Sequence, residues 1–457
     1  MVGNNRKAEA QARACAQCLA HVLERCLLQH QPADRVLAAL LRQHREYGSR
    51  DRRLISHTVF ATLRWWGWLH ELAPEAFRTT LESVQDSEKQ TESLSRVRWQ
   101  LWSEVLLAAT MLEYDSLPSV CWRYTWHMKR NPRFLQRWQA PSNPTERMAR
   151  IWTCLHSEAP KRAFPLRDLL PTWCFQEIHS GIAHDRLVQW LQKRPPLWLR
   201  FQGQNPQHVL RELKQAGLEA VAQADSPRAI KLEQARVNVH TLPAFRQGRI
   251  EIQDLASQVI GRVCAPEPGQ RWWDACSGGG GKALQLASLM RSRGSVIASD
   301  IRAYKLKDLK RRARRGGFHN IEMKAWDGGP VSGRRSMYDG VLVDAPCTCS
   351  GTWRRNPDGR WRLAPAEVGE MADLQLQILT NAAPGVRPGG VLVYATCSMF
   401  QRENEGVVDR FLSACEGFFL EPFFHPLSGK KTSGMLMLWP WEYDTDAMFV
   451  ARLRRHA

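Results

Sequence analysis

A glycine-rich turn in the second half of the chain reads Asp274-Ala275-Cys276-Ser277-Gly278-Gly279-Gly280-Gly281-Lys282. It ends a strand predicted at Trp272–Ala275 and precedes a helix predicted at Ala283–Met290. Glycines let a backbone approach a ligand closely, and the N–H groups at the start of the helix can point toward it. The turn is not a Walker loop, because Ala283 stands where Ser or Thr should follow the lysine. Such a turn alone is a weak signal, but in order with Asp300, Asp344-Ala345-Pro346-Cys347 and Thr396-Cys397-Ser398 it predicts a nucleotide-type cofactor site.

Strands and helices alternate regularly from about Gln253 onward. Further strands are predicted at Ser295–Ser299, Ile321–Ala325, Gly340–Val343 and Gly390–Ala395. Such alternation predicts a mostly parallel, doubly wound sheet, in which ligands bind beyond the carboxyl ends of the strands. The residues expected at that edge are Asp274, Asp300, Asp327, Asp344 and Thr396. Asp300 is placed to accept hydrogen bonds from ribose hydroxyls; the alternative is a cap for the helix predicted at Ala303–Arg315.

Two cysteines directly follow buried strands in this half. Cys347 ends the segment Asp344-Ala345-Pro346-Cys347, and Cys397 lies in Thr396-Cys397-Ser398. A lone cysteine in such a place is more often inert packing. Two cysteines at equivalent strand ends, one of them close to an aspartate, instead indicate reactive thiols. The thiolate is the competent nucleophile, and a position at a strand end among helix N-termini can stabilise it.

The length of 457 residues predicts two or three domains. Apolar residues recur at helical spacing from Ala8 to Leu72 and from Val97 to Tyr114, so we predict an all-α domain over residues 1–160. Residues 161–249 are predicted to form a small α/β connector, either a module that grips substrate or a spacer, with strands at Leu197–Phe201 and Ala229–Leu232 and a helix at Pro206–Ala216. The cofactor domain is then 250–457. The polar stretch Thr80–Ser95 is predicted to be a loop.

Lysines and arginines number 64 against 45 acidic residues, a net charge of +19. This charge favours a polyanionic partner, either nucleic acid or an anionic membrane surface. No apolar run reaches the ~20 residues that cross a bilayer, and Met1 leads into the polar stretch Asn4 to Lys7 with no signal-peptide core behind it, so we expect a cytoplasmic protein. The helix Ala303–Arg315 carries seven Lys and Arg residues, which form either a solvated face or one that tracks phosphates. Better placed for RNA, close to Cys347, are Arg354, Arg355, Arg360 and Arg362.

Twelve cysteines in a chain of this kind indicate reduced thiols rather than a disulfide framework. Cys15 and Cys18 could begin a zinc site, but no second pair follows and they share a helical face with Cys26, so a buried apolar stripe is favoured and no metal is predicted. Cys349, close after Cys347, could form a redox or metal pair, although no further ligands lie nearby in the sequence. Core packing is favoured over RNA stacking for a tryptophan group consisting of Trp65, Trp66, Trp68, Trp99 and Trp102.

These motifs together resemble the RsmB-like (Fmu/Sun) ribosomal RNA cytosine-5 methyltransferases, within the wider group of RNA 5-methylcytosine methyltransferases. The resemblance covers nearly the whole chain, and its helical N-terminus is similar to a NusB-like RNA-binding domain. Besides the segments above, it includes Gln253–Gln258, Arg354–Asp358, Glu403–Glu405, Pro195–Arg200 and His240–Phe245. It implies a C-terminal Rossmann-like class I methyltransferase domain.

The resemblance also implies the roles of single residues. Cys397 would be the nucleophile, Cys347 would help release the methylated base, and Asp344 would contact both base and cofactor. The implied cofactor, S-adenosylmethionine, would be bound by Cys276, Ser277, Gly278, Gly279, Gly280, Gly281, Lys282, Asp300, Lys305, Asp327 and Asp344. The chain departs from the family at Ser277-Gly278-Gly279, where Ala-Ala-Pro is usual, which gives a loop that costs more entropy to order.

The expected partner is RNA, with small-subunit ribosomal RNA as the substrate, and we expect a monomer with no membrane partner. The same chemistry on transfer RNA is the nearest alternative. A non-catalytic RNA-binding ribosome-assembly factor is another, although pure binding needs neither Cys347 nor Cys397. A zinc or redox protein is the third.

Overall fold

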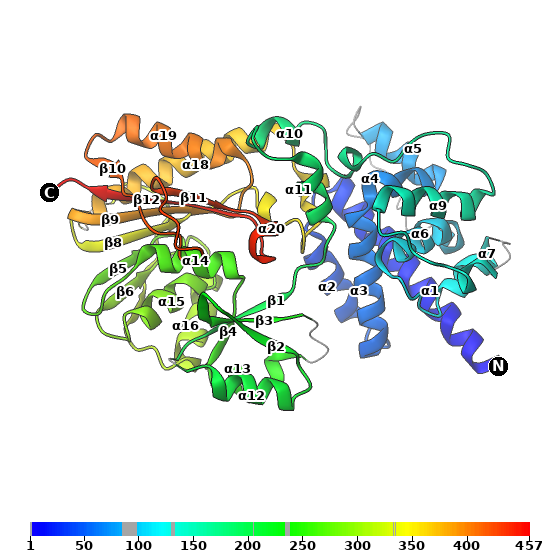
Figure 1. Ribbon diagram of the computed structural model, residues 1–457, viewed down its shortest axis with the longest axis horizontal. Coiled ribbons are helices and arrows are strands. Elements are labelled where there is room, and N and C mark those ends of the chain that lie inside the picture. Colours follow the sequence, from blue (N-terminus) through cyan, green and yellow to red (C-terminus); the bar gives the residue numbers. More distant parts are fainter. Residues whose placement is uncertain are drawn as a thin grey trace. The chain divides into compact units, whose positions relative to one another are not determined.

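A computed structural model describes residues 2–84, 98–128, 133–203, 205–233, 238–331, 333 and 335–457. Contacts divide the chain into two compact units, and each is described here by itself. The first consists of Met1–Gln176, Gly181–Lys193 and Trp353–Leu363, and the second of Glu177–Ser180, Arg194–Thr352 and Ala364–Ala457. The first unit is helical and the second is α/β, which confirms the predicted fold class (Figure 1). The predicted division into three domains at residues 160 and 249 stays a prediction.

The helical unit is built from apolar stripes at helical spacing. Its main helices are α1 (Val2–Leu23), α2 (Ala33–Gln43), α3 (Ser49–Arg64), α4 (Trp66–Leu69), α5 (Glu75–Val84), α6 (Ser103–Glu113), α7 (Cys121–His127), α8 (Arg133–Gln136), α9 (Pro144–His156), α10 (Cys174–Glu177) and α11 (His184–Leu191). Helix α6 is buried from Val105 to Leu112 and contacts α1, α3, α7 and α9. No described helix has both the length and the apolarity needed to cross a bilayer.

Burial in this unit decides two sequence predictions. Cys15, Cys18 and Cys26 are buried on the apolar face of the first helical segment, which confirms the apolar stripe. Trp68 and Trp102 are fully buried, which confirms core packing. The predicted loop at Thr80–Ser95 is wrong over residues 80–84, which belong to α5. The buried Phe77 anchors this helix to the core. Residues 85–95 lie outside the described residues.

A short segment of the second half, Trp353–Leu363, belongs to the helical unit and contains α17 (Gly359–Arg362). The Arg360 guanidinium is fully buried and donates to the backbone carbonyls of Leu169, Leu191 and Trp353. Burial lowers the pKa of Arg360 to about 9. Arg354 is also fully buried, so the prediction that these two arginines face RNA is wrong, because both are taken up by internal contacts. Arg355 is exposed.

The second unit begins with an antiparallel four-stranded sheet of order β2-β3-β1-β4. Its elements are β1 (Leu197–Phe201), α12 (Gln207–Gln215), β2 (Ala220–Gln223), β3 (Ser226–Leu232), α13 (Pro243–Arg246) and β4 (Ile250–Ile252). Helix α12 ends before Gly217, whose φ of 75° lies in the left-handed region that glycine adopts without strain. The predicted connector strands and helix are confirmed.

The larger sheet has the order β10-β12-β9-β8-β5-β6-β7, with β11 paired to β12. Its strands are β5 (Arg271–Asp274), β6 (Ser295–Ala298), β7 (Ile321–Met323), β8 (Tyr338–Asp344), β9 (Val386–Thr396), β10 (Phe418–Leu420), β11 (Met435–Leu438) and β12 (Met448–Arg455). Strands β5 to β9 are parallel, while β12 runs antiparallel to β9. The carboxyl ends of the parallel strands therefore meet at one edge, as predicted.

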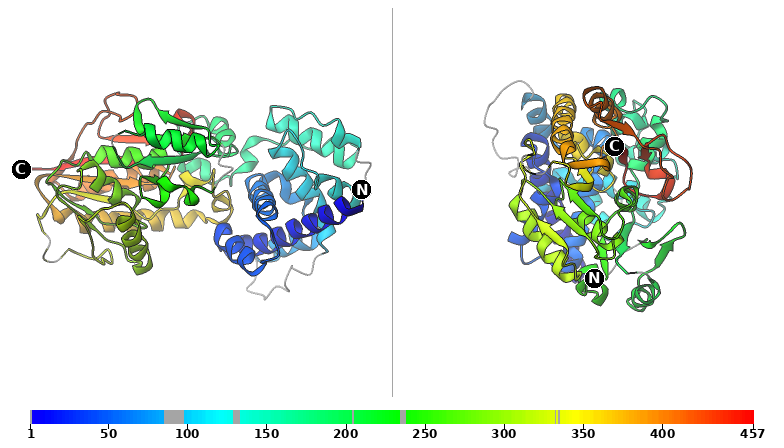
Figure 2. Two further views of the ribbon diagram at one scale, coloured as in Figure 1. Left: turned by 90° about the horizontal axis from the view of Figure 1, so that it is seen from below. Right: turned by 90° about the vertical axis from the view of Figure 1, so that its left-hand side faces the viewer.

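Helices cover both faces of this sheet (Figure 1, Figure 2). Residues of α14 (Leu255–Cys264), α15 (Gly281–Leu289) and α16 (Ala303–Arg315) join one core cluster, and residues of α18 (Pro365–Ala382) and α19 (Glu405–Ala414) join the other. The neighbouring residues Trp272 and Trp273 belong to opposite clusters, because successive side chains of a strand point to opposite faces. The short helix α20 (Pro440–Tyr443) precedes the last strand.

Candidate active site

The glycine-rich turn leads from the end of β5 into α15 and is tied to the end of β6. The Ser277 N–H donates to the Ser299 carbonyl at 2.7 Å, and the Gly278 N–H donates to the Asp300 carboxylate at 2.9 Å. Gly280 has a φ of 84°, and a Cβ at this position would lie 2.0 Å from the side chain of Leu309. Glycine at 280 is therefore required both by the backbone conformation and by the close packing of α16.

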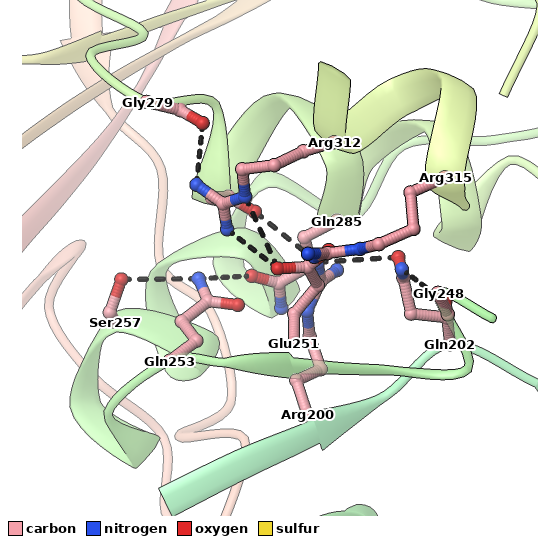
Figure 3. Close-up of polar contacts among 11 residues, drawn as sticks. Arg200, Gln202, Gly248, Glu251, Gln253, Ser257, Gly279, Gln285, Arg312 and Arg315 are labelled. Atoms are coloured by element: carbon pink, nitrogen blue, oxygen red, sulfur yellow. Dashed lines mark hydrogen bonds and ion pairs between the residues drawn. The ribbon is translucent and has the colours of Figure 1, made fainter. Parts of the chain in front are cut away.

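A buried carboxylate and an arginine hold the other side of this turn (Figure 3). Arg312 of α16 donates to the Gly279 carbonyl and, through Nε and Nη2, to Glu251 of β4 at 3.2 and 2.9 Å. Glu251 is only 2% exposed and also pairs with Arg315. Bonds to a buried carboxylate restrict the arginine strongly. The flexible Ser277-Gly278-Gly279 sequence is thus fixed by side chains from elsewhere in the fold.

The basic face of α16 consequently divides into two parts. Arg312 and Arg315 form ion pairs with Glu251. For these two side chains, both predictions, a solvated face and a face that tracks phosphates, are therefore wrong. The exposed basic residues of the helix are Lys307, Lys310, Arg311 and Arg314. Behind the cluster, Arg200 of β1 is 3% exposed and donates to the Gly281 carbonyl at 3.4 Å, and burial lowers its pKa to about 9.

Asp300 lies at the end of β6 and is 5% exposed. Its carboxylate accepts from the Arg302 backbone N–H at 2.8 Å and from the Arg302 guanidinium at 2.9 and 3.0 Å. Although burial acts in the opposite direction, these bonds hold its pKa below the usual value. Asp300 is therefore an ionised acceptor beside the glycine-rich turn. It does not cap α16, because the N-cap position is Arg302 and no side chain makes a capping hydrogen bond there.

The other two expected ligands lie at the same edge in more open surroundings. Asp327 follows β7, is exposed, and accepts the Gly329 N–H at 3.0 Å. Lys305 is half-buried in the first turn of α16, with its Nζ 5.6 Å from the ring centroid of Tyr304. The structure thus brings Asp300 directly to the turn, whereas the contacts of Asp327 and Lys305 are local.

Three ionisable groups meet where β5 and β8 end. Lys282 Nζ lies 2.6 Å from Asp344 Oδ2, and burial raises the pKa of Asp344 although Lys282 opposes this shift. Asp274 is fully buried, and burial together with the charge of Asp344 raises its pKa to about 8. The backbone N–H of Cys276 lies near the Asp274 carboxylate without a well-formed hydrogen bond, and the buried Ser277 hydroxyl has no partner among the described residues. Such unsatisfied buried groups are typical of a ligand site.

Replacing Asp274 by asparagine should change how stability depends on pH. The pKa of this carboxyl is about 8 in the folded chain and near 3.8 in the unfolded one, so between these values the folded chain holds the extra proton. The group therefore lowers the free energy of unfolding by about 1.4 kcal/mol for each pH unit of rise within that window. Chemical denaturation at several pH values measures the free energy of unfolding of the parent and of Asp274→Asn. As pH rises, the parent should lose stability relative to the variant. A difference that does not change with pH would contradict the assigned pKa.

The two predicted thiols meet at the ends of β8 and β9. Cys347 Sγ lies 3.3 Å from Cys397 Sγ, and both residues are half-buried. Hydrogen bonds with Cys349 and with Cys397, followed by burial, raise the pKa of the Cys347 thiol well above its usual value. Since Cys347 keeps its proton, it can donate to Cys397 and favour the thiolate there.

Glu403 holds both cysteine segments in place. Its buried carboxylate accepts from the Thr348 N–H at 2.9 Å, from the Ser398 hydroxyl and from the Gln375 amide at 2.8 Å. Thr348 follows Cys347 and Ser398 follows Cys397, so one carboxylate sets the separation of the two thiols. The sequence had no local signal for this role, because the carboxylate and Thr348 are 55 positions apart.

Family models match most of the second unit. Residues 262–454 match the model described as 16S rRNA methyltransferase RsmB/F, and residues 170–240 match the RsmF/B-like ferredoxin-like domain. A curated relative from Synechocystis, a probable ribosomal RNA small subunit methyltransferase B, is 32% identical over 301 residues. That match covers 62% of this chain and 66% of the relative. The chain thus spans just under two thirds of that relative's length.

Solved structures are similar over longer stretches. The crystal structure of PH0851 has a TM-score of 0.72 and 25% identity, and the match covers 96% of this chain and 99% of that one. NSun6 from Pyrococcus horikoshii, solved with SFG, has a TM-score of 0.54 and 18% identity over 63% of this chain and 97% of its own. The second likeness is one of fold.

Proposed function

We propose that this chain, whose residues 262–454 and 170–240 match two models of the RsmB/F methyltransferase family, methylates carbon 5 of a cytosine in RNA. The proposed methyl donor is S-adenosylmethionine, and the proposed substrate is small-subunit ribosomal RNA. One observation supports the cytosine-5 chemistry most directly: Cys347 Sγ and Cys397 Sγ are 3.3 Å apart at neighbouring strand ends. The carboxylate of Asp344 ends the first of these strands.

The residues at the strand ends fit this cofactor chemically. Asp300 is ionised and can accept hydrogen bonds from the ribose hydroxyls, while the backbone of Ser277 to Gly280 offers close approach. The unsatisfied carboxylate of Asp274 could accept a cationic ammonium group, which would also lower its raised pKa. Support also comes from NSun6, whose structure contains SFG, an analogue of S-adenosylmethionine. When bound, the cofactor supplies an electrophilic methyl group.

Cys397 begins the reaction by making carbon 5 nucleophilic. Its thiolate adds to carbon 6 of the base, forming a sulfur–carbon bond while the electrons of the 5,6 double bond move into the ring. Asp344 is proposed to lie beside the ring nitrogen: burial raises the pKa of its carboxyl although Lys282 opposes this shift, and a hydrogen bond with this group would stabilise the charge that develops there. The resulting enamine then takes the methyl group at carbon 5.

Cys347 serves the release step. Once Cys397 carries a carbon substituent, Cys347 loses a neighbour that raised its pKa, and its thiol then gives up a proton more readily. As a thiolate it can take the proton from carbon 5. The electrons of that C–H bond restore the 5,6 double bond, and the bond between Cys397 and carbon 6 breaks. The ring face must be open throughout, so the target cytosine must be unstacked.

The net charge of +19 favours RNA as the partner, and a helical unit that binds RNA is part of the proposal. We also propose that the protein acts as a cytoplasmic monomer. Bisulfite sequencing of ribosomal and transfer RNA, from cells with and without the protein, tests the substrate. A cytosine of small-subunit ribosomal RNA should lose its methylation when the protein is absent. A loss confined to transfer RNA would replace the proposed substrate, and no loss in either RNA would favour a non-catalytic assembly factor.

Replacing Arg312 by alanine should weaken S-adenosylmethionine binding by ~5- to 10-fold, about the contribution of one charge-assisted hydrogen bond. The Gly279 carbonyl would lose its donor and the glycine-rich turn would become more mobile before binding. Arg311→Ala is the matched control, because Arg311 lies on the same helix, is 81% exposed and pairs with Asp308. Calorimetric titration should find unchanged affinity for Arg311→Ala. Equal affinities for both variants would show that Arg312 does not order the turn.

A further inference from the structure

A third thiol lies beside the two at the strand ends. The sulfurs of Cys347, Cys349 and Cys397 all lie within 4.8 Å of one another. In the part of the chain that the structure describes, this is the one group of three or more such side chains close enough to share a metal ion. The sequence placed Cys349 near Cys347, but Cys397 comes from the next strand, 48 positions after Cys349.

The backbone turns the third thiol toward the other two. Cys349 has a φ of 57°, a left-handed conformation that a residue with a side chain adopts rarely and at a cost of ~1 kcal/mol. The turn is held by its neighbours: the Cys349 carbonyl accepts from the Thr352 N–H and hydroxyl at 3.0 and 2.9 Å. Ser350 is buried, and its hydroxyl oxygen accepts from the Met399 backbone N–H at 2.8 Å, just after the end of β9. The Cys349 sulfur lies 3.4 Å from the Cys347 carbonyl.

We infer that Cys347, Cys349 and Cys397 form a binding site for a thiophilic divalent cation, with Zn²⁺ as the reference case. Zinc–sulfur bonds are ~2.3 Å long, so two sulfurs on one zinc lie roughly 3.8 to 4.0 Å apart. In the structure the sulfur–sulfur distances run from 3.3 Å, between Cys347 and Cys397, to no more than 4.8 Å. The three sulfurs would therefore need to move only slightly to reach the separation found on zinc. Cys349 is exposed, which gives the ion an entry path and leaves a fourth position for water.

Binding is a proton exchange without any redox step. Three S–H bonds break, three sulfur–metal bonds form, and three protons pass to solvent. The product carries one net negative charge, and the Lys282 ammonium group lies on the same side of the sheet edge, 2.6 Å from Asp344.

Occupation of this site would block the chemistry proposed above, because the lone pairs of Cys397 would be bound to the metal. This consequence rests on the proposed function, whereas binding itself does not. Cys349 forms no bond to the base in the proposed methyl transfer and acts there only through its hydrogen bond with Cys347, whereas in the metal site its thiol is a direct ligand.

Titration of the full chain with Cd²⁺ tests binding, since cadmium thiolates absorb in the ultraviolet with an intensity that rises with the number of sulfurs bound. The parent should bind one Cd²⁺ with an intensity for three thiolates, in a buffer with a thiol-free reductant. Cys349→Ser should show the intensity for two and bind at least ~10-fold more weakly, or about 1.4 kcal/mol. Cys415→Ser, a half-buried thiol elsewhere, is the control and should match the parent. Equal intensity and affinity in Cys349→Ser and the parent would overturn the site.

A second measurement separates this inference from the proposed function. The Zn²⁺ concentration that halves methyl transfer, measured for each protein relative to its own rate without metal, should be at least ~10-fold higher for Cys349→Ser than for the parent. Equal inhibition of both proteins would overturn the site. If neither protein methylates RNA, the proposed function fails, and the Cd²⁺ titration alone decides whether the three thiols bind metal.

Discussion

Replacing Cys397 by serine should abolish RNA methylation, with a rate at least ~10⁴-fold below that of the parent. The hydroxyl of serine is not ionised at neutral pH, and the site is built to favour a thiolate rather than an alkoxide. Cys347 Sγ is 3.3 Å from Cys397 Sγ and keeps its proton, which provides a hydrogen bond to that thiolate. Without a bond from the enzyme to carbon 6, carbon 5 remains too poor a nucleophile to accept a methyl group.

Transfer of a radiolabelled methyl group to RNA transcripts would measure this loss. Cys415→Ser serves as the matched control, because it removes a half-buried thiol outside the strand ends. Cofactor affinity should be unchanged in the Cys397 variant, which separates loss of the nucleophile from loss of fold. Parental activity in Cys397→Ser would refute the covalent mechanism.

Replacing Cys347 by alanine should trap a covalent protein–RNA adduct, whereas replacing Cys397 prevents the adduct from forming. In the proposed mechanism, addition by Cys397 and methylation still proceed without the second thiol, although more slowly because the Cys397 thiolate loses a hydrogen bond, whereas removal of the carbon 5 proton depends on Cys347. The adduct should therefore form and persist through denaturation, while turnover falls by on the order of 10²- to 10⁴-fold, the usual contribution of a positioned base.

Denaturing electrophoresis with labelled RNA would detect the adduct as a shifted band that nuclease removes. The double variant Cys347→Ala with Cys397→Ala should give no band, because the bond-forming sulfur is then absent. A band in the double variant would assign the bond to another residue, and no band in the single variant would remove the release role of Cys347.

Much of the second unit could be predicted because its signals are local. Helix α16 was predicted at Ala303–Arg315 and has those bounds, since its apolar stripe, Leu309 and Ala313, is buried as expected. The parallel strands appear within a few residues of their predicted positions, and their polar ends lie at one sheet edge. Once the strand order is that of a doubly wound fold, this convergence follows from geometry.

Other features depended on partners far away along the chain. Arg360 could not be distinguished from a surface arginine, because the carbonyls of Leu169 and Leu191 that receive its hydrogen bonds are 191 and 169 positions away. Arg312 had two solvent-facing interpretations and instead binds Glu251, 61 positions earlier. In each case the side chain's environment is made by segments whose proximity no local pattern encodes.

Residue order alone determined the alternation of strands and helices, and with it the placement of Asp300, Asp344 and the two cysteines at strand ends, because hydrophobic periodicity acts over a few neighbouring residues. Only the tertiary structure decided that Glu403 holds both cysteine segments and that Cys349 lies within 4.8 Å of Cys397. Those distances follow from packing between strands and turns about 50 positions apart, which depends on the whole sheet being assembled.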